Sequence, residues 1–243
     1  MAPELRGLVA CVWAAQLGAT GERHVERVIP DGCIDLVFSD GALVIAGPDT
    51  ASVELEMIPN RSFVGVRFRV GVAPAALGVP ATALLDQRLL ARDVVGARAA
   101  ELEQALAETA NARQAAAVLE RAAHTWLREA ADGAADALVR GAVLELTTAR
   151  QDWTVTTLAA RLGVSERQLR RRFVEAVGYG PKLLQRVLRL RRFIRAASEP
   201  RCPGLATLAL EAGYADQPHL SRECRELTGS TPAQLLGYPV TAA

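Results

Sequence analysis

Two short stretches of the chain gather arginine and amide side chains, which are groups that hydrogen-bond to DNA bases. The stretch after Ser165 carries Arg167, Gln168, Arg170, Arg171 and Arg172. The stretch after Asp216 carries Gln217, Ser221, Arg222 and Arg225. Arginine can donate two hydrogen bonds to the O6 and N7 atoms of guanine, and glutamine pairs with the N6 and N7 atoms of adenine. These residue types therefore point to binding in the major groove of DNA.

The elements that must hold the first stretch are two helices joined by a short turn. The helix before the turn has one apolar face, made by Leu158, Ala159 and Leu162. Gly163 suits the left-handed conformation that ends a helix, and Ser165 is a favourable N-cap for the next one. In that next helix apolar residues recur at every fourth position: Leu169, Phe173 and Val177. The arginines then fall on the opposite side, as in a DNA-binding helix-turn-helix.

The same pattern returns further along the chain. Its apolar positions are Leu205, Leu208, Ala209 and Ala212 before the turn, and Leu220, Cys224 and Leu227 after it. Gly213 marks the turn, Asp216 is the expected N-cap, and Pro218 fits the first helical turn, where its missing N–H is no loss. One such hairpin also occurs in proteins that do not bind DNA, whereas two in tandem in a basic segment indicate DNA binding.

A long helix from about residue 181 to 198 is expected between the two units. Together with Arg172, its arginines are candidate contacts to DNA phosphates, which set affinity without reading sequence. They are Arg186, Arg189, Arg191, Arg192 and Arg195. Solvated surface arginines are the alternative interpretation of these positions.

The charges divide the chain into two parts. The whole chain has a net charge of +1, but residues 1–133 carry a net charge of −5 and residues 134–243 a net charge of +6. Opposite charge in two segments suggests two domains with different partners, and the basic one is suited to an anionic ligand. We therefore expect a regulatory and dimerisation domain over 1–133 and a DNA-binding domain over 134–243.

The N-terminal part has the pattern of β-structure up to about residue 70. Short apolar or alternating runs are separated by turn residues, among them the Asp-Gly steps at 31–32 and 40–41, which are hairpin signals. The spacing predicts a small antiparallel barrel or sandwich. Helices follow from about residue 97 to 131, with a break at Asn111 and apolar positions at Leu102, Leu106, Val118, Leu119, Trp126 and Leu127. These positions could pack inside the domain or form a subunit interface.

The residues from about 134 to 238 resemble the DNA-binding domain of the AraC/XylS family of bacterial transcriptional regulators. The resemblance is carried by Leu158-Ala-Ala-Arg-Leu-Gly-Val-Ser-Glu-Arg-Gln-Leu-Arg-Arg-Arg-Phe, by Gly178-Tyr-Gly-Pro and by the run from Ala209 to Leu235. It implies a bilobed all-α domain that inserts one helix of each unit into successive major grooves. The positions that touch bases in the family correspond here to Arg167, Gln168, Arg170, Arg171, Gln217, Pro218, Ser221 and Arg222. The chain departs from the family at Cys224, where an aromatic residue usually packs, and at His219.

The N-terminal part resembles a sensor-like domain that precedes such DNA-binding domains and has a cupin-like β-fold. The resemblance is carried by the run from Arg27 to Phe38, by Ala46-Gly-Pro, by Val64-Gly-Val-Arg-Phe and by Leu77-Gly-Val-Pro-Ala. With the helical C-terminal part, such a domain makes the chain α+β. The resemblance implies no defined ligand, but the mouth of a small β-barrel is a common ligand site and a regulator needs an input, so we expect a small-molecule effector. We expect the effector pocket, or the face toward the second domain, near Asp31, Cys33, Asp35, Arg67 and Arg69. A structural role in the Pro-Asp-Gly turn is the alternative for Asp31 and Cys33.

The sequence gives little support for a metal site or for catalytic activity. Cys11, His24 and Cys33 could converge as soft ligands, but no local spacing supports a site, so we expect no metal and no cofactor. No Gly-x-Ser-x-Gly, Walker or dinucleotide fingerprint is present, and the three histidines are isolated. A cupin-type enzyme with an appended DNA-binding module and a sequence-indifferent architectural DNA binder remain alternatives.

The remaining expectations concern location and partners. The four cysteines form no CxxC pair, which favours a reducing cytoplasm, and neither a secretory signal nor an apolar run of about 18 residues is present. The sequence thus predicts a cytoplasmic transcriptional regulator that is not an enzyme. Its expected partners are double-stranded DNA, RNA polymerase, a small effector and a second copy of the chain, without a membrane.

Overall fold

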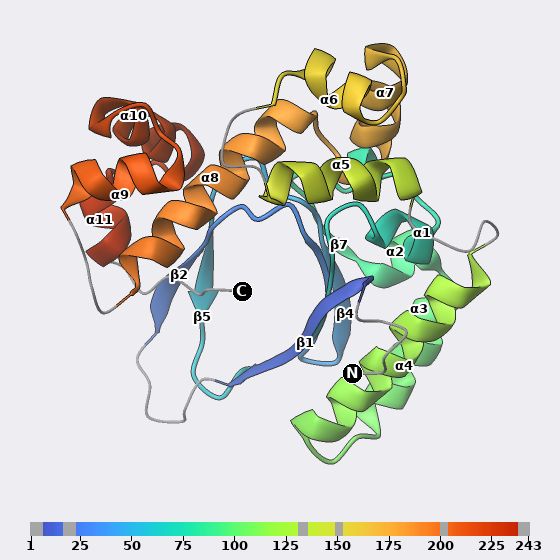
Figure 1. The fold of residues 1–243 in the computed structure, drawn as a ribbon. Helices are drawn as coiled ribbons and strands as arrows, with labels where there is room; N and C mark the ends of the chain where they lie inside the picture. The colour runs from blue at the N-terminus through green and yellow to red at the C-terminus, as the bar shows by residue number, and fades with distance from the viewer. Residues whose placement is uncertain (1–6, 17–22, 131–135, 149–152, 200–203, 238–243) are drawn as a thin grey trace.

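The computed structural model describes residues 7–16, 23–130, 136–148, 153–199 and 204–237 (Figure 1). Strands dominate the first third of the chain and helices the rest, so the predicted α+β class is confirmed. Within these residues no helix is long and apolar enough to cross a membrane.

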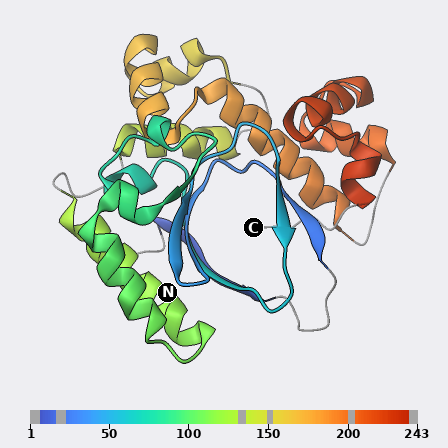
Figure 2. The same cartoon turned by 180° about the vertical axis from the view of Figure 1, so that it is seen from behind.

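The strands form two antiparallel sheets. Their bounds are β1 Val9–Gln16, β2 His24–Val28, β3 Ile34–Ser39, β4 Ala42–Ala46, β5 Val53–Met57, β6 Ser62–Phe68 and β7 Arg88–Leu90. One sheet has the order β1-β6-β3-β4-β7, and the other pairs β2 with β5. In Figure 2 the two sheets curve toward each other around a common centre. The expected barrel-like arrangement is therefore built from two sheets.

The two Asp-Gly steps behave differently. Asp40 and Gly41 have φ values of 51° and 78° and close the β3–β4 hairpin, as predicted. Gly32 also has a positive φ, 79°, but its turn joins β2 to β3, which pair with different strands. The hairpin predicted at residues 31–32 is therefore wrong, because β2 leaves the large sheet to pair with β5.

Helices cover the outer face of the five-stranded sheet. Their bounds are α1 Ala73–Leu77, the 3-10 turn η2 Ala81–Ala83, α2 Ala91–Val95, α3 Ala97–Ala107 and α4 Ala112–Glu129. Asn111 caps α4 by accepting a hydrogen bond from the Gln114 backbone N–H at 3.0 Å, which confirms the predicted break. Leu106 and Leu119 are almost fully buried in the hydrophobic core that these helices form with the sheet. These helices thus pack inside their own chain, and the dimer stays a prediction.

The C-terminal helices form two small bundles that share one long helix. Their bounds are α5 Ala137–Thr148, α6 Val155–Arg161, α7 Glu166–Val177, α8 Pro181–Ala197, α9 Leu205–Ala212, α10 Gln217–Thr228 and α11 Pro232–Gly237. The first core joins α5, α6 and α7 to the start of α8, and the second joins α9, α10 and α11 to its end. The helix expected at about 181–198 is α8.

The helical part rests directly on the β-part. The Ser52 backbone N–H donates to the Leu227 carbonyl at 2.8 Å, and Ile29 lies in the same core as Leu190. A Cβ on Gly178 would lie 3.0 Å from the Pro48 side chain and 3.3 Å from the Ala81 carbonyl oxygen, so the two segments approach closely. The predicted boundary at residue 133 falls outside the described residues, and the division into two domains remains a proposal.

Candidate nucleic-acid interface

Helix α7, the first of the two helices expected to enter the groove, begins where its sequence predicts. The Ser165 side chain accepts a hydrogen bond from the Gln168 backbone N–H at 3.2 Å. At the other end Gly178 adopts a left-handed conformation, with φ 92°. Leu169, Phe173 and Val177 are buried and hold the helix against its bundle. The opposite face of α7 is left toward solvent.

The second recognition helix, α10, repeats this construction. It has 12 residues, as α7 has. The Asp216 side chain accepts from the His219 backbone N–H at 2.7 Å, and Gly229 ends the helix with φ 69°. Arg171 and Arg222 are each the sixth residue of their helix and are exposed. The two helices therefore offer the same kind of outward surface.

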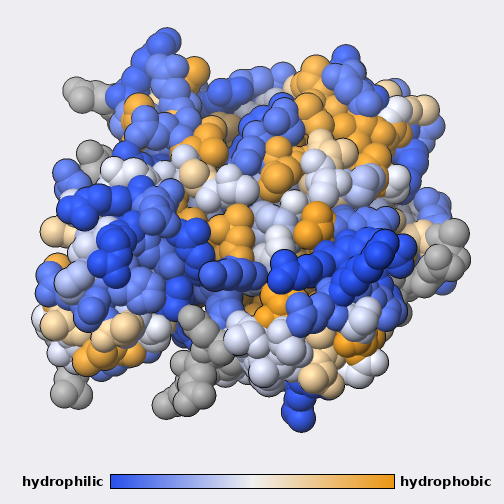
Figure 3. Space-filling model, turned by 90° about the horizontal axis from the view of Figure 1, so that it is seen from above, coloured by the Kyte–Doolittle hydropathy of each residue, from blue (hydrophilic) through white to orange (hydrophobic). Residues whose placement is uncertain are grey.

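The structure leaves seven of the eight predicted base-contacting residues exposed and the eighth half-buried. The exposed ones are Arg167, Gln168, Arg170, Arg171, Gln217, Pro218 and Arg222, and the half-buried one is Ser221. An open hollow of about 350 Å³ on α7 is lined by Ser165, Arg167, Gln168 and Arg171. Seen from above, hydrophilic residues gather on both sides of the molecule, toward α9–α11 on the left and α6 and α7 on the right (Figure 3).

Part of α7 is close to the β-part of the chain. A second open hollow, of about 540 Å³, lies between the η2 region and the middle of α7. Pro80 and Thr82 line it on one side, and Arg170, Arg171 and Val174 line it on the other. The N-terminal segment of the chain therefore flanks α7 beside Arg170 and Arg171, although both side chains remain exposed.

At least three of the arginines considered as phosphate contacts, Arg172, Arg186 and Arg189, have carboxylate partners. Arg172 binds Asp136 through two hydrogen bonds of 2.5 Å. Arg189 is buried and binds Glu223, so a phosphate contact is wrong for this residue. The Arg189–Glu223 pair was not predicted, because its partners lie 34 residues apart on different helices and no local spacing reveals it.

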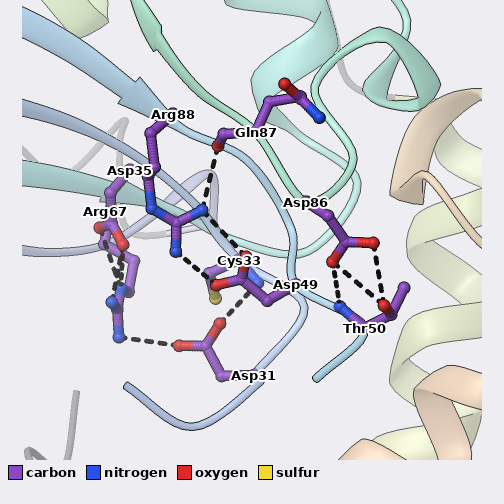
Figure 4. A network of polar contacts seen from close by, with 9 residues as sticks. All are labelled: Asp31, Cys33, Asp35, Asp49, Thr50, Arg67, Asp86, Gln87 and Arg88. Carbon is purple, nitrogen blue, oxygen red and sulfur yellow. Dashed lines mark hydrogen bonds and ion pairs between the residues drawn. The ribbon is translucent and has the colours of Figure 1, made fainter. Parts of the chain in front are cut away.

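The residues predicted around an effector site come mainly from neighbouring strands. The pairing of β1, β6 and β3 places Cys11, Arg67 and Asp35 in one row across the sheet. The Arg67 guanidinium contacts both oxygens of Asp35 at 2.6 to 3.1 Å and lies 2.8 Å from Asp31 (Figure 4). Burial raises the pKa of Asp35, and the Arg67 contacts oppose that rise.

The turn before β3 contributes the other predicted residues. Asp31 accepts a hydrogen bond from the Cys33 backbone N–H at 2.8 Å, so it has a structural role in the turn. Burial raises the pKa of the Cys33 thiol well above its usual value, which favours the protonated thiol. A Cβ on Gly32 would lie 2.8 Å from Leu184 and 3.1 Å from the Tyr179 hydroxyl. This turn thus faces the helical part. The sequence predicts either an effector pocket or a face toward the second domain here, and the second of these requires such a contact.

Arg69, the last residue of the predicted effector set, lies outside the strands that carry Arg67 and Asp35. Arg69 is exposed just past the end of β6, and its backbone N–H donates to the Leu8 carbonyl at 2.9 Å. Arg88 and Asp49 form a further ion pair of 2.6 Å beside the cluster, which sequence reasoning missed (Figure 4). His24 lies on the small sheet and Cys11 on the large one. Among the described residues, no three His, Cys, Asp or Glu side chains are arranged to hold a metal.

Comparisons with known proteins bear on both parts of the chain. Residues 158–237 match the family described as a helix-turn-helix domain, and residues 2–90 match a domain of unknown function, DUF6597. No curated protein matches.

Among solved structures, ToxT from Vibrio cholerae aligns over 96% of this chain and 97% of its own, at 10% identity and a TM-score of 0.47. ToxT with a bound unsaturated fatty acid aligns over 97% of both chains, at 11% identity and a TM-score of 0.46. From the family matches, the chain carries a helix-turn-helix domain over residues 158–237, and residues 2–90 match a domain whose function is unknown.

Proposed function

We propose that this protein is a sequence-specific transcription regulator that places α7 and α10 in neighbouring major grooves of one DNA duplex. The observation that carries the proposal is the matched construction of the two helices, each capped at both ends and each with an exposed arginine at its sixth position. A major groove about 12 Å wide admits one α-helix, and the side chains on its outer face reach the base edges.

The proposed base contacts divide between the two helices. Arg167, Gln168, Arg170 and Arg171 read one part of the site, with guanine and adenine as the partners that suit their donors. Gln217, Ser221 and Arg222 read the other part, and Pro218 offers an apolar contact to a thymine methyl group. Each well-aligned two-bond contact contributes about 1–3 kcal/mol of discrimination.

The N-terminal domain is proposed to control how the two helices are presented. It contacts both units: η2 lies beside α7, and the small sheet binds the end of α10 through Ser52 and Arg27. A small effector bound near Asp31, Asp35 and Arg67 would act on the turn that contacts Leu184 of α8. An effector shifts such an equilibrium only by binding the two arrangements with different affinity.

The proposed partners are double-stranded DNA, a small effector, RNA polymerase and a second copy of the chain. A dimer would place four recognition helices on two half-sites and increase the binding affinity through their linkage. Light scattering on the purified protein, alone and with DNA, measures the number of copies in each state.

The experiment that tests the proposal is competition binding. DNA recovered by the full-length protein from a random library is labelled and challenged with unselected DNA over a range of salt concentrations. We expect the selected DNA to bind about a thousandfold or more tightly than unselected DNA, and both affinities to fall steeply with salt. Equal affinity for the two pools would refute a sequence-specific regulator and favour an architectural binder.

A further inference from the structure

A buried carboxylate lies at the joint between α10 and the long helix α8. Glu223 is only 5% exposed, and it is on the side of α10 that faces away from the proposed DNA surface. Its two oxygens accept hydrogen bonds from Arg189 at 3.1 and 2.9 Å, and one of them also accepts from Arg186 at 3.1 Å. Two arginines of α8 thus hold one residue of α10.

The surroundings of this ion cluster are closely packed. Arg189 is itself 5% exposed, and its guanidinium lies 4.9 Å from the ring centroid of Tyr214, in the turn before α10. His219 packs edge-on against Tyr214 and has its Nε2 atom 4.0 Å from Glu223. Arg186 also binds Glu226, which lies about one helical turn after Glu223 on α10. The contacts therefore extend along α10 from its first turn to its last third.

Apolar side chains pack beside this cluster, among them Leu220 and Leu227 of α10 and Phe193 of α8. Cys224 occupies the position in the stripe where the sequence resemblance leads us to expect an aromatic ring. Burial of apolar surface is non-directional, so it constrains the rotation of a helix less tightly than a directional polar contact does. A guanidinium instead accepts a carboxylate in a narrow range of directions. The ion cluster thus adds a directional contact that constrains the rotation of α10 on α8.

We infer that Glu223 is a positioning residue for DNA recognition, which sets the spacing and relative orientation of α7 and α10 through Arg189 and Arg186. The inference rests on the proposed function. Helix α8 belongs to both bundles, so an element locked to its end is held at a constant distance from α7. Removal of one partner would leave a buried charge without compensation, and α10 would move to expose it to water.

The test measures how strongly DNA affinity depends on the spacing between the α7 and α10 portions of the binding site. The full-length protein and its Glu223→Gln variant are compared on selected DNA in which the α7 and α10 portions are moved apart or together by one base pair. We expect the natural protein to lose about tenfold or more in affinity on the shifted sites, as for a lost base contact. The variant should lose less than about threefold between the original and shifted sites, although it binds both more weakly.

A matched control separates positioning from stability. Cys224→Ala removes apolar volume from the same core but leaves the ion cluster intact, so it should lower the melting temperature and keep the spacing preference. A double variant, Glu223→Met with Arg189→Met, removes the pair without leaving either charge unpaired. It should regain melting temperature relative to Glu223→Gln and keep the relaxed spacing preference. If Glu223→Gln does not fold, the double variant and Arg189→Lys supply the same comparison.

The outcomes distinguish the inference from the proposed function. Specific binding by the natural protein, together with an unchanged spacing preference in Glu223→Gln or in the double variant, would overturn the positioning role alone. Relaxed spacing in Cys224→Ala to the same degree would also overturn it, because any loosening of the core would then suffice. Absence of specific binding by the natural protein would overturn the proposed function, and the inference with it.

Discussion

At the residue scale, Arg171 and Arg222 carry the clearest expectation. Both are exposed at equivalent positions of α7 and α10, and within the described residues neither forms an ion pair. Replacement by alanine removes the proposed two-bond base contact without touching the core. We expect Arg171→Ala and Arg222→Ala each to weaken binding to selected DNA by about 1–3 kcal/mol.

Gel-shift titration measures this effect, and circular dichroism checks that the helices remain. Arg113→Ala is the matched control, since Arg113 is exposed on α4, away from both recognition helices. It should leave the affinity unchanged. An affinity loss in Arg171→Ala that is accompanied by a loss of helix content would show a structural role instead.

The Arg172–Asp136 pair carries a prediction about pH. Partial burial raises the pKa of Asp136, but hydrogen bonds from Arg172 and from the α5 backbone outweigh this effect, and the net pKa lies below its usual value. A carboxylate with a lowered pKa in the folded state stabilises the protein above its unfolded pKa, near 4, and this stabilisation is lost as the pH falls through the folded pKa.

Asp136→Asn keeps the cap of α5 and removes the charge, so it should lower the free energy of unfolding at pH 7 by about 0.5–1 kcal/mol. The difference from the natural protein should shrink between pH 5 and the acid limit of folding. Urea denaturation at several pH values measures it. A difference that stayed constant down to pH 3 would show that the charge is not its cause. Glu211→Gln, at an exposed position of α9, serves as the control.

At the element scale, the helices and the β3–β4 hairpin followed from local sequence, whereas the pairing of distant strands did not. Ser165, Asp216 and Asn111 each cap the helix that their position predicts, because capping depends on residues only a few positions apart. The pairing of β2 with β5, and the row formed by Cys11, Arg67 and Asp35, depend on contacts between distant segments. No local pattern specifies such pairing, so the arrangement of the predicted effector residues could not be foreseen.

In the large sheet, Gly65 leaves space for the side chain of Trp13. The Trp13 indole lies across Gly65, where an added Cβ would come within 2.5 Å of the ring, and its Nε1 donates to Asp35 at 3.3 Å. Gly65→Ala should therefore displace Trp13 and lower the free energy of unfolding by about 1–3 kcal/mol. Combining it with Trp13→Ala should remove most of the additional cost, because the clash is then absent. Urea denaturation of the two single variants and the double variant measures the coupling, and additive effects would contradict the contact.

At the scale of the whole molecule, the N-terminal part holds the end of α10. Arg27 binds the Thr228 carbonyl and the Ser230 side chain, and Ser52 donates to the carbonyls of Leu227 and Thr228. Arg27→Ala should raise amide hydrogen exchange over residues 225–230 and leave α6 and α7 unchanged, because the substitution removes the contacts to Thr228 and Ser230 at the end of α10, together with the ion pair to Glu54 on β5. Mass spectrometry of exchange measures it. Arg23→Ala, which removes an exposed ion pair with Glu56 on the same sheet, should have no such effect.

The most direct test of two reading helices on one duplex is a parallel selection from a random DNA library. The natural protein, Arg171→Ala and Arg222→Ala are each used at full length. The account predicts that the natural protein recovers two blocks of defined sequence about one helical turn, roughly 10 base pairs, apart. Each variant should lose definition in a different block. A single block, or the same change in both variants, would contradict the account.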